Sequence, residues 1–522
     1  MMYIETSKQI ALTKNLINDQ IQKAKAKNFK KFLEGLPPNS LAFKKIYSYL
    51  KIKPNSFCAE LNNTDTTLYD HAEIAKCFHS HFHTVYEEKV PNHTTVHTVN
   101  SSLSEKLTNI PNSITQFNSV QNSFDGFKIH QSFISYNFLE STVKSLNTKK
   151  SAGPDEISKF ILKKIPENAI KFLTILFNNC INLGYFPTHW KTAKIIPIKK
   201  RTAAKVVGDY RPISLLSNVG KLFEKVLYLK MEDHLQNDSI PDLQFGFKRS
   251  HLTLHSLLKF ANDITLNLRT KNSTVAISLD IEKAFDSVYH KGLIYKLYEL
   301  NFPPSFVKLL ASFLSNRQFF VQIRDTTSEL GHIKSGVPQG SILSPLLFNL
   351  FLYDFPHIIH GSTSILYADD ALIYATDRSP IRALEIAKVH LNKIMEYYTK
   401  WGIKINESKT DLICIRNSYT NGHRHTVKES KTLSMKINNS TIRVKDSFKY
   451  LGVNFNKLFK FNKHGRTVLG KASGRFACLS PILISSYLSK SLKLLLYKVA
   501  IDRLSHTLYR YGLQCHQQSQ TN

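Results

Sequence analysis

The stretch SILYADDALIY, residues 364–374, sets two adjacent carboxylates, Asp369 and Asp370, between two short β-prone apolar runs. Two such runs joined by a tight acidic turn predict a β-hairpin with both aspartates at its tip. Adjacent carboxylates repel each other unless a cation neutralises them, so the pair suggests a metal site. For an isolated Asp-Asp pair, a solvated turn or a helix cap is the common alternative.

A third carboxylate stands at the end of another predicted strand. Residues 274–279 read TVAISL, which is typical of a buried strand, and Asp280 follows directly. Two strands can bring Asp280 beside Asp369, although a strand-end cap is the alternative for Asp280 alone. Oxygen ligands of this kind suit Mg²⁺ or Mn²⁺, and two such ions about 3.5–4 Å apart recur in phosphoryl transfer.

The composition predicts a globular protein that binds a polyanion. The chain has 522 residues, is 42% hydrophobic and carries 70 Lys and Arg against 39 Asp and Glu, a net charge of +31. Positive charge of this size, spread along the chain, fits a nucleic-acid groove. No uninterrupted apolar segment is long enough for a membrane span and the first residues lack a signal-peptide core, so we expect no membrane partner and an intracellular location.

Cysteine and histidine positions give little support for a zinc site. The six cysteines lack CxxC spacing, which favours free thiols. Residues 71–83 hold Cys77 and several histidines, but the apolar side chains of residues 74–85 recur at helical spacing. We therefore predict an amphipathic helix whose histidines are incidental.

Seven short motifs follow one another in a fixed order along the chain. They are SAGPD at 151–155, DYRPIS at 209–214, QFGF at 244–247, LDIEKAFD at 279–286, GVPQGS at 336–341, YADD at 367–370 and YLGV at 450–453. Each is weak alone, but the ordered series is specific. Over residues 140–500 the chain resembles the reverse transcriptases of non-LTR (LINE-type) retrotransposons, close to the jockey group.

The resemblance implies an α+β fold of the right-hand polymerase type, with fingers, a palm built on an antiparallel sheet and a partial helical thumb. We expect a helical extension over residues 1–90, a polar linker over 91–127, fingers and palm over 128–455, and a truncated thumb over 456–522. The endonuclease domain and zinc knuckle of full-length relatives are not found in this sequence, so this chain alone is expected not to nick DNA.

The resemblance also implies the catalytic groups. Asp280, Asp369 and Asp370, with Ile281 beside them, form the implied metal set for two Mg²⁺ ions, with Mn²⁺ as a substitute. Lys409 matches the lysine proposed to protonate pyrophosphate as a general acid, and a plain surface lysine is its alternative. Asp286 follows Phe285 at an expected helix start, where a capping role is at least as plausible.

A second set of residues is implied to bind the incoming nucleotide. Phe285 stands at the sugar-gate position, where a bulky ring would exclude a 2′-OH; a core aromatic is the alternative. Gln339 and Gly340 belong to the loop that approaches the nucleotide. Arg211 and Lys199 match phosphate-binding residues, although the choice between Lys199 and Lys200 stays open and a solvated basic loop is the alternative.

The resulting hypothesis is an RNA-directed DNA polymerase that adds dNTPs to the 3′-OH of a DNA primer on an RNA template. Tyr450, Leu451 and Gly452 resemble the primer grip that sets this hydroxyl in line. Two alternatives stay open: a nucleic-acid-binding relic with impaired catalysis, and an RNA-dependent RNA polymerase, against which Phe285 argues. Nuclear or cytoplasmic residence is inherited from the family, and the sequence predicts neither the template nor the oligomeric state.

Overall fold

The computed structural model describes residues 60–62, 67–89, 91, 93–108, 133–148, 151–200, 204–235, 240–416, 432–484 and 490–498. The chain divides into two units. The large unit comprises Ser56–Gly452 and Lys457–Phe459, and the other unit includes Val453–Asn456 and the described residues from Lys460 onward. The large unit contains every predicted site residue. The first 59 residues of the expected N-terminal extension lie outside the described residues.

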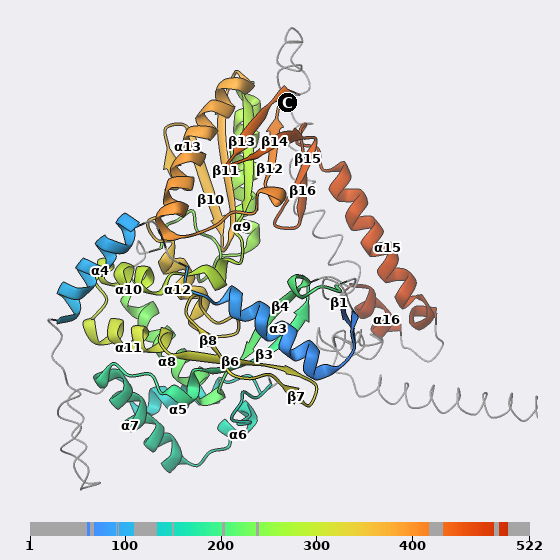
Figure 1. The fold of residues 1–522 in the computed structure, drawn as a ribbon. Coiled ribbons are helices and arrows are strands. Elements are labelled where there is room, and N and C mark those ends of the chain that lie inside the picture. The colour runs from blue at the N-terminus through green and yellow to red at the C-terminus, as the bar shows by residue number, and fades with distance from the viewer. Residues whose placement is uncertain are drawn as a thin grey trace, which may run out of the picture. The chain divides into compact units, whose positions relative to one another are not determined.

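The large unit contains a seven-stranded sheet, which lies in the upper part of Figure 1. Its strand order is β13-β14-β12-β5-β11-β10-β9, and every neighbouring pair is antiparallel except β12 with β14. The strands are β5 (Ser273–Asp280), β9 (Ile358–Ile359), β10 (Ser362–Tyr367), β11 (Asp370–Asp377), β12 (Asp411–Ile415), β13 (Ser434–Ile437) and β14 (Ser440–Lys445). The predicted hairpin and the predicted strand ending at Asp280 are both confirmed.

Helices α9 (Thr253–Arg269) and α13 (Pro380–Trp401) both pack on this sheet. Their packing explains why β5 and β11 read as nearly continuous apolar runs rather than alternating ones, since the interior of each strand is almost entirely buried. Because these two strands are neighbours, their ends are held in one register by buried main-chain pairing along eight residue pairs.

A second sheet has the order β4-β3-β6-β7, with β8 also paired to β6. Its strands are β3 (Thr192–Lys199), β4 (Tyr210–Leu215), β6 (Arg317–Ile323), β7 (Thr326–Thr327) and β8 (Gly331–Ile333). Helix α3 (His71–Val85) packs against β6 and buries Phe78 and Phe82 in a small core with Tyr210 and Phe319. The predicted amphipathic helix is therefore confirmed, and it belongs to the same compact unit as the sheets.

The other described α-helices and strands belong to one or the other of the two units. In the large unit these are β1 (Leu61–Asn62), β2 (Thr67–Leu68), α4 (His93–Thr108), α5 (Tyr136–Lys144), α6 (Lys159–Leu162), α7 (Glu167–Leu183), α8 (Asn218–His234), α10 (His290–Glu299), α11 (Pro304–Leu314), α12 (Ser344–Phe351) and β15 (Ser447–Tyr450). The other unit contains β16 (Val453–Asn456), α15 (Asn462–Ile484) and α16 (Lys490–Tyr497).

This mixture of helices with mainly antiparallel sheets confirms the α+β class. The expected polar linker at 91–127 needs a correction, because α4 occupies residues 93–108 and buries Val99 and Leu103 in the main core. Its helix is rich in Thr and Ser, so composition concealed it. No helix in the described part of the chain is long and apolar enough to cross a bilayer.

Candidate active site

The three predicted carboxylates lie at the ends of neighbouring strands in the seven-stranded sheet. Asp370 is the first residue of β11 and lies opposite Asp280, the last residue of β5, in the antiparallel register. Asp369 lies in the two-residue turn between β10 and β11, beside Ala368, which adopts a left-handed φ of 57°. The acidic turn is therefore fixed by strand pairing on one side and by an unusual backbone conformation on the other.

The QFGF motif braces this turn. The side-chain oxygen of Gln244 accepts hydrogen bonds from the amides of Gly246 at 2.9 Å and Ala368 at 3.1 Å. A Cβ on Gly246 would come within 2.1 Å of the Ala368 nitrogen, so only glycine allows this approach. Asn349 of α12 donates to the Gly246 carbonyl at 2.8 Å. The motif therefore holds Asp369 in place without reaching the reacting groups itself.

The site strongly disfavours three bare negative charges. Burial raises the pKa of Asp369, with further repulsion from Asp280. Burial, Asp369 and Asp280 together raise the pKa of Asp370 to about 6. Lys409 offsets part of the repulsion between the carboxylates, since its Nζ lies 3.0 Å from Oδ2 of Asp280. The general-acid candidate therefore contacts the principal carboxylate directly.

The donor set fits a hard divalent cation because it consists of carboxylate oxygens. For Asp369 and Asp370, burial first and repulsion between the carboxylates second raise the pKa, and a bound cation would offset both effects. Within the described residues, no three His, Cys, Asp or Glu side chains are already gathered as a metal ion needs. A divalent ion bound at Asp280 would compete with Lys409, which contacts Oδ2 of that carboxylate. Ile281, named with this set, is buried and forms an isolated bridge with Ile405.

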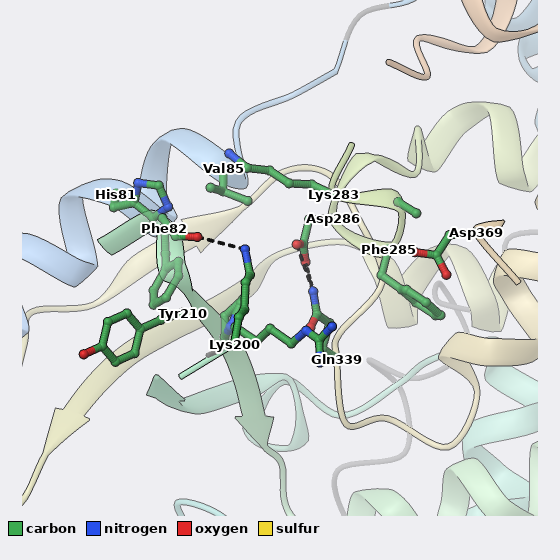
Figure 2. A pocket seen from close by; sticks show the side chains of 14 residues that line it. His81, Phe82, Val85, Lys200, Tyr210, Lys283, Phe285, Asp286, Gln339 and Asp369 are labelled. Carbon is green, nitrogen blue, oxygen red and sulfur yellow. Dashed lines mark hydrogen bonds between the residues drawn. The ribbon is translucent and has the colours of Figure 1, made fainter. Parts of the chain in front are cut away.

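A cavity of about 370 Å³ opens beside Asp369 (Figure 2). Its walls combine a cationic group, formed by Lys200, Arg211 and Lys283, with the side chains of Phe285 and Gln339. Burial lowers the pKa of Lys200, and the neighbouring charges of Lys409 and Arg211 lower it further. An anionic ligand in this cavity would offset the repulsion that Lys200 experiences from its cationic neighbours.

The cavity distinguishes between the two candidate lysines. Lys200 lines it and donates from Nζ to the Gly208 carbonyl at 2.8 Å, whereas Lys199 ends β3 opposite Tyr210 and is absent from the lining. Of the two candidates, Lys200 is therefore the one at the cavity, and the role of Lys199 stays a prediction. Arg211, predicted with it, does line the cavity.

Phe285 is held by two other aromatic rings. It stacks on Phe348 with ring centroids 4.9 Å apart and meets Phe247 edge-on at 5.8 Å. The ring is thus packed against other aromatic rings and also lines the cavity. This position is compatible with both the core aromatic and the sugar gate that the sequence suggested.

Gln339 and Asp286 form a pair that the sequence did not predict. The Gln339 amide nitrogen lies 3.0 and 2.9 Å from the two oxygens of Asp286, which is buried in a short 3₁₀ turn, Ala284–Ser287. Helix capping by Asp286 is therefore wrong. The next residue, Gly340, has a φ of +135°, and a Cβ there would lie 2.4 Å from the Ser214 carbonyl oxygen, so this loop lies directly against β4.

The predicted primer-grip residues lie at the end of β15, whose last residue is Tyr450. Tyr450 is 2% exposed and its hydroxyl lies 2.7 Å from that of Ser256 on α9. Burial raises its pKa, and the charge of Asp370 raises it further, so the ring lies within electrostatic range of the carboxylates. Leu451 and Gly452 then turn the chain with φ of +44° and +88°.

Sequence reasoning missed the contribution of α3. His81, Phe82 and Val85 line the same cavity as Asp369, although they precede it by almost 300 positions. Among the histidines predicted to be incidental, His81 lines this cavity and His79 is buried. In the sequence, the cluster of histidines on α3 was the only feature that could have indicated that this helix contributes to the cavity. Lys283 was also missed, although it lies within the LDIEKAFD motif.

Comparison with known proteins assigns this arrangement to a family. Residues 198–455 match the model described as "Reverse transcriptase (RNA-dependent DNA polymerase)". Among curated proteins, the RNA-directed DNA polymerase from mobile element jockey of Drosophila melanogaster is 30% identical over 72% of this chain and 40% of its own length. The probable RNA-directed DNA polymerase from transposon BS of the same organism is 32% identical over 62% of this chain and 36% of its own.

A third relative, the probable RNA-directed DNA polymerase from the Drosophila melanogaster X-element, is 30% identical over 71% of this chain and 40% of its own. The chain thus spans about 40% or less of the length of these relatives. Among solved structures, apo telomerase from Candida tropicalis is 12% identical, with 66% of this chain and 63% of that chain covered and a TM-score of 0.38.

Proposed function

Since this chain belongs to the reverse transcriptases of jockey-like non-LTR retrotransposons, we propose that it extends a DNA primer with dNTPs on an RNA template. In this proposal the seven-stranded sheet is the palm of a right-hand polymerase and the β3–β4–β6 sheet belongs to the fingers. Helices α15 and α16 form the described part of a thumb.

The carboxylates of Asp280, Asp369 and Asp370, with the Ile281 main chain, are the proposed holders of two Mg²⁺ ions. Such ions, when bound, lower the pKa of the primer hydroxyl and neutralise the triphosphate. Lys409 has to leave Asp280 for this, and its ammonium group is then free to protonate the departing pyrophosphate. The ion pair in the structure therefore represents a resting arrangement.

The cavity residues have the complementary task of binding the nucleotide. Lys200, Arg211 and Lys283 supply positive charge for the triphosphate, and the fork of Arg211 suits two phosphate oxygens at once. Phe285 closes the side where a 2′-OH would enter. The turn at Tyr450–Gly452 supports the primer end, so that the hydroxyl meets the α-phosphate in line.

One observation carries this proposal: the register-paired Asp280 and Asp370 adjoin a cavity that holds Asp369 together with three cations. Paired acids alone fit a metal-binding turn, and a basic cavity alone fits any anion. Their combination fits a reaction in which a polyanionic substrate is attacked under divalent-metal control.

The test is extension of a labelled oligo(dT) primer on poly(rA) by the purified full chain with dTTP and Mg²⁺. We expect extension by the wild type and a loss of at least ~100-fold in rate with Asp369→Ala/Asp370→Ala, because metal-based charge stabilisation is worth several kcal/mol. Asp325→Asn, which changes an exposed carboxylate between β6 and β7, is the matched control and should keep full activity.

The same assay separates the alternatives. Absence of extension by the wild type, with salt-sensitive template binding retained, would favour a binding relic over an active polymerase. Extension with UTP as efficient as with dUTP would favour an RNA-dependent RNA polymerase. Equal loss in Asp325→Asn would mean that the double variant acts through folding rather than through the site.

A further inference from the structure

A second cavity, of about 340 Å³, lies at the start of helix α10. Its lining comes from the segment after α3, the start of α10, the α11–β6 junction and β8. It is distinct from the cavity beside Asp369, because the two have no lining residue in common. Neither the family match nor the polymerase proposal gives this cavity a task.

The charge of this cavity is positive. Lys291, Arg317 and Lys334 contribute three cations to its lining, against Glu88 as the one acid. His290 adds no charge near neutral pH, since burial lowers its pKa to about 4. Its ring Nε2 lies 2.7 Å from the Gly336 carbonyl oxygen, to which the neutral ring donates. Lys291 and Lys334 are exposed at the rim, so a ligand from solution meets them first.

Arg317 supplies an unsatisfied guanidinium. The residue is 0% exposed, and its Nη1 donates to the Phe313 carbonyl at 3.0 Å. Within the described residues, its Nε and Nη2 have no hydrogen-bond partner. The nearby carboxylate of Glu224 accepts instead from Ser341 Oγ and the Ile342 amide, both at 2.6 Å. Arg317 is also among the residues that line the cavity, so its buried positive charge favours an anion bound there.

The helix terminus adds donors of the same kind. Helix α10 runs for ten residues from His290, and its N-cap, Tyr289, provides no side-chain hydrogen bond. The first amide N–H groups of an uncapped helix point outward with a partial positive charge, which suits a phosphate. Tyr289, His290 and Lys291, the residues around this terminus, all line the cavity.

We propose that this cavity is a phosphate-binding site, built by Arg317, Lys291, Lys334 and the N-terminus of α10. The ligand is a phosphate group, carried either by the backbone of single-stranded RNA or by free phosphate. A site for the RNA backbone would hold the template at a second point, away from the carboxylates. Binding here needs neither the metal ions nor polymerase activity, so it stands or falls separately from the proposed reaction.

The experiment uses the full chain with EDTA and without nucleotides. Binding of a fluorescent single-stranded RNA is followed by anisotropy across a salt series, for the wild type, Lys291→Ala/Lys334→Ala and the control Lys163→Ala/Lys164→Ala. The control removes two exposed lysines that line neither cavity. If both rim lysines contact phosphates, the slope of log K against log salt should fall by about 1.4, at roughly 0.7 per contact, only in the first variant.

Free phosphate is tested by thermal melts of the same three proteins with and without inorganic phosphate. A phosphate-dependent rise in Tm that Lys291→Ala/Lys334→Ala abolishes, with RNA binding unchanged, would support the site with free phosphate as its ligand. Loss of RNA affinity confined to this variant would support the RNA backbone.

Equal losses in the control, or no change in either measurement, would overturn the proposal. Arg317→Met probes the inner wall, with its fold checked by circular dichroism. If that variant does not fold, the rim lysines still decide the question.

Discussion

At the scale of single residues, packing holds Phe285, the proposed sugar gate, in the cavity wall. Phe348 and Phe247 contact its ring from two directions, and these contacts oppose its rotation out of the cavity wall. A packed aromatic is thus a more rigid barrier than an exposed one. This rigidity is what a steric test of the ribose 2′ position requires.

Replacing Phe285 by Val should relax that selectivity. Opening space beside the ribose is expected to lower the preference for dUTP over UTP, measured as the ratio of kcat/KM values on poly(rA), by about 10- to 200-fold. Phe285→Tyr keeps the ring and should keep the preference. If Phe285→Val is active and still rejects UTP as strongly as the wild type, the gate lies elsewhere.

At the scale of elements, the sequence predicted what local patterns encode. The β10–β11 hairpin and β5 were predictable because apolar runs and an acidic turn specify them within a few residues. The Gln339–Asp286 pair was not, because it joins two loops about 50 positions apart. Helix α4 was missed because few of its residues are apolar, and the lining by α3 was missed because periodicity predicts a helix but not its partner.

Helix α3 leads to a prediction about the cavity beside Asp369, which we propose binds the nucleotide. His81 lies close enough to Lys283 and Lys200 that their charges lower its pKa, with burial as the larger cause. A carboxylate at this position would pair with those lysines and repel a triphosphate. We therefore expect His81→Glu to raise the KM for dNTPs at least tenfold in primer extension, while kcat changes less.

The matched control on this helix is His83→Glu. His83 does not line the cavity and lies 3.9 Å from Glu87, so a carboxylate there should leave the KM within about twofold of the wild type. Similar KM values for His81→Glu and the wild type would place the triphosphate away from α3.

At the scale of the whole molecule, buried acids of the site lower the stability of the fold. The chain carries +31 charges, yet Asp286 is buried among its lysines with a pKa raised to about 6 from 3.8, mainly by desolvation. Its hydrogen bond from Gln339 and the charge of Lys283 offset this only in part. The buried Asp286 in the wall of the cavity beside Asp369 therefore lowers the stability of the folded protein near neutral pH.

The sign of this effect gives a test on the intact protein. Between pH 3.8 and 6 native Asp286 keeps a proton that the unfolded chain has lost, so its contribution to the free energy of unfolding falls as the pH rises through this window. Asp286→Asn removes the ionisation. Its free energy of unfolding relative to wild type should therefore increase by up to about 3 kcal/mol between pH 4 and pH 7, measured by urea titration in EDTA. For the control Asp325→Asn, the difference in free energy of unfolding from the wild type should not change with pH. A difference that is also independent of pH for Asp286→Asn would show that Gln339 and the lysines already compensate the buried charge.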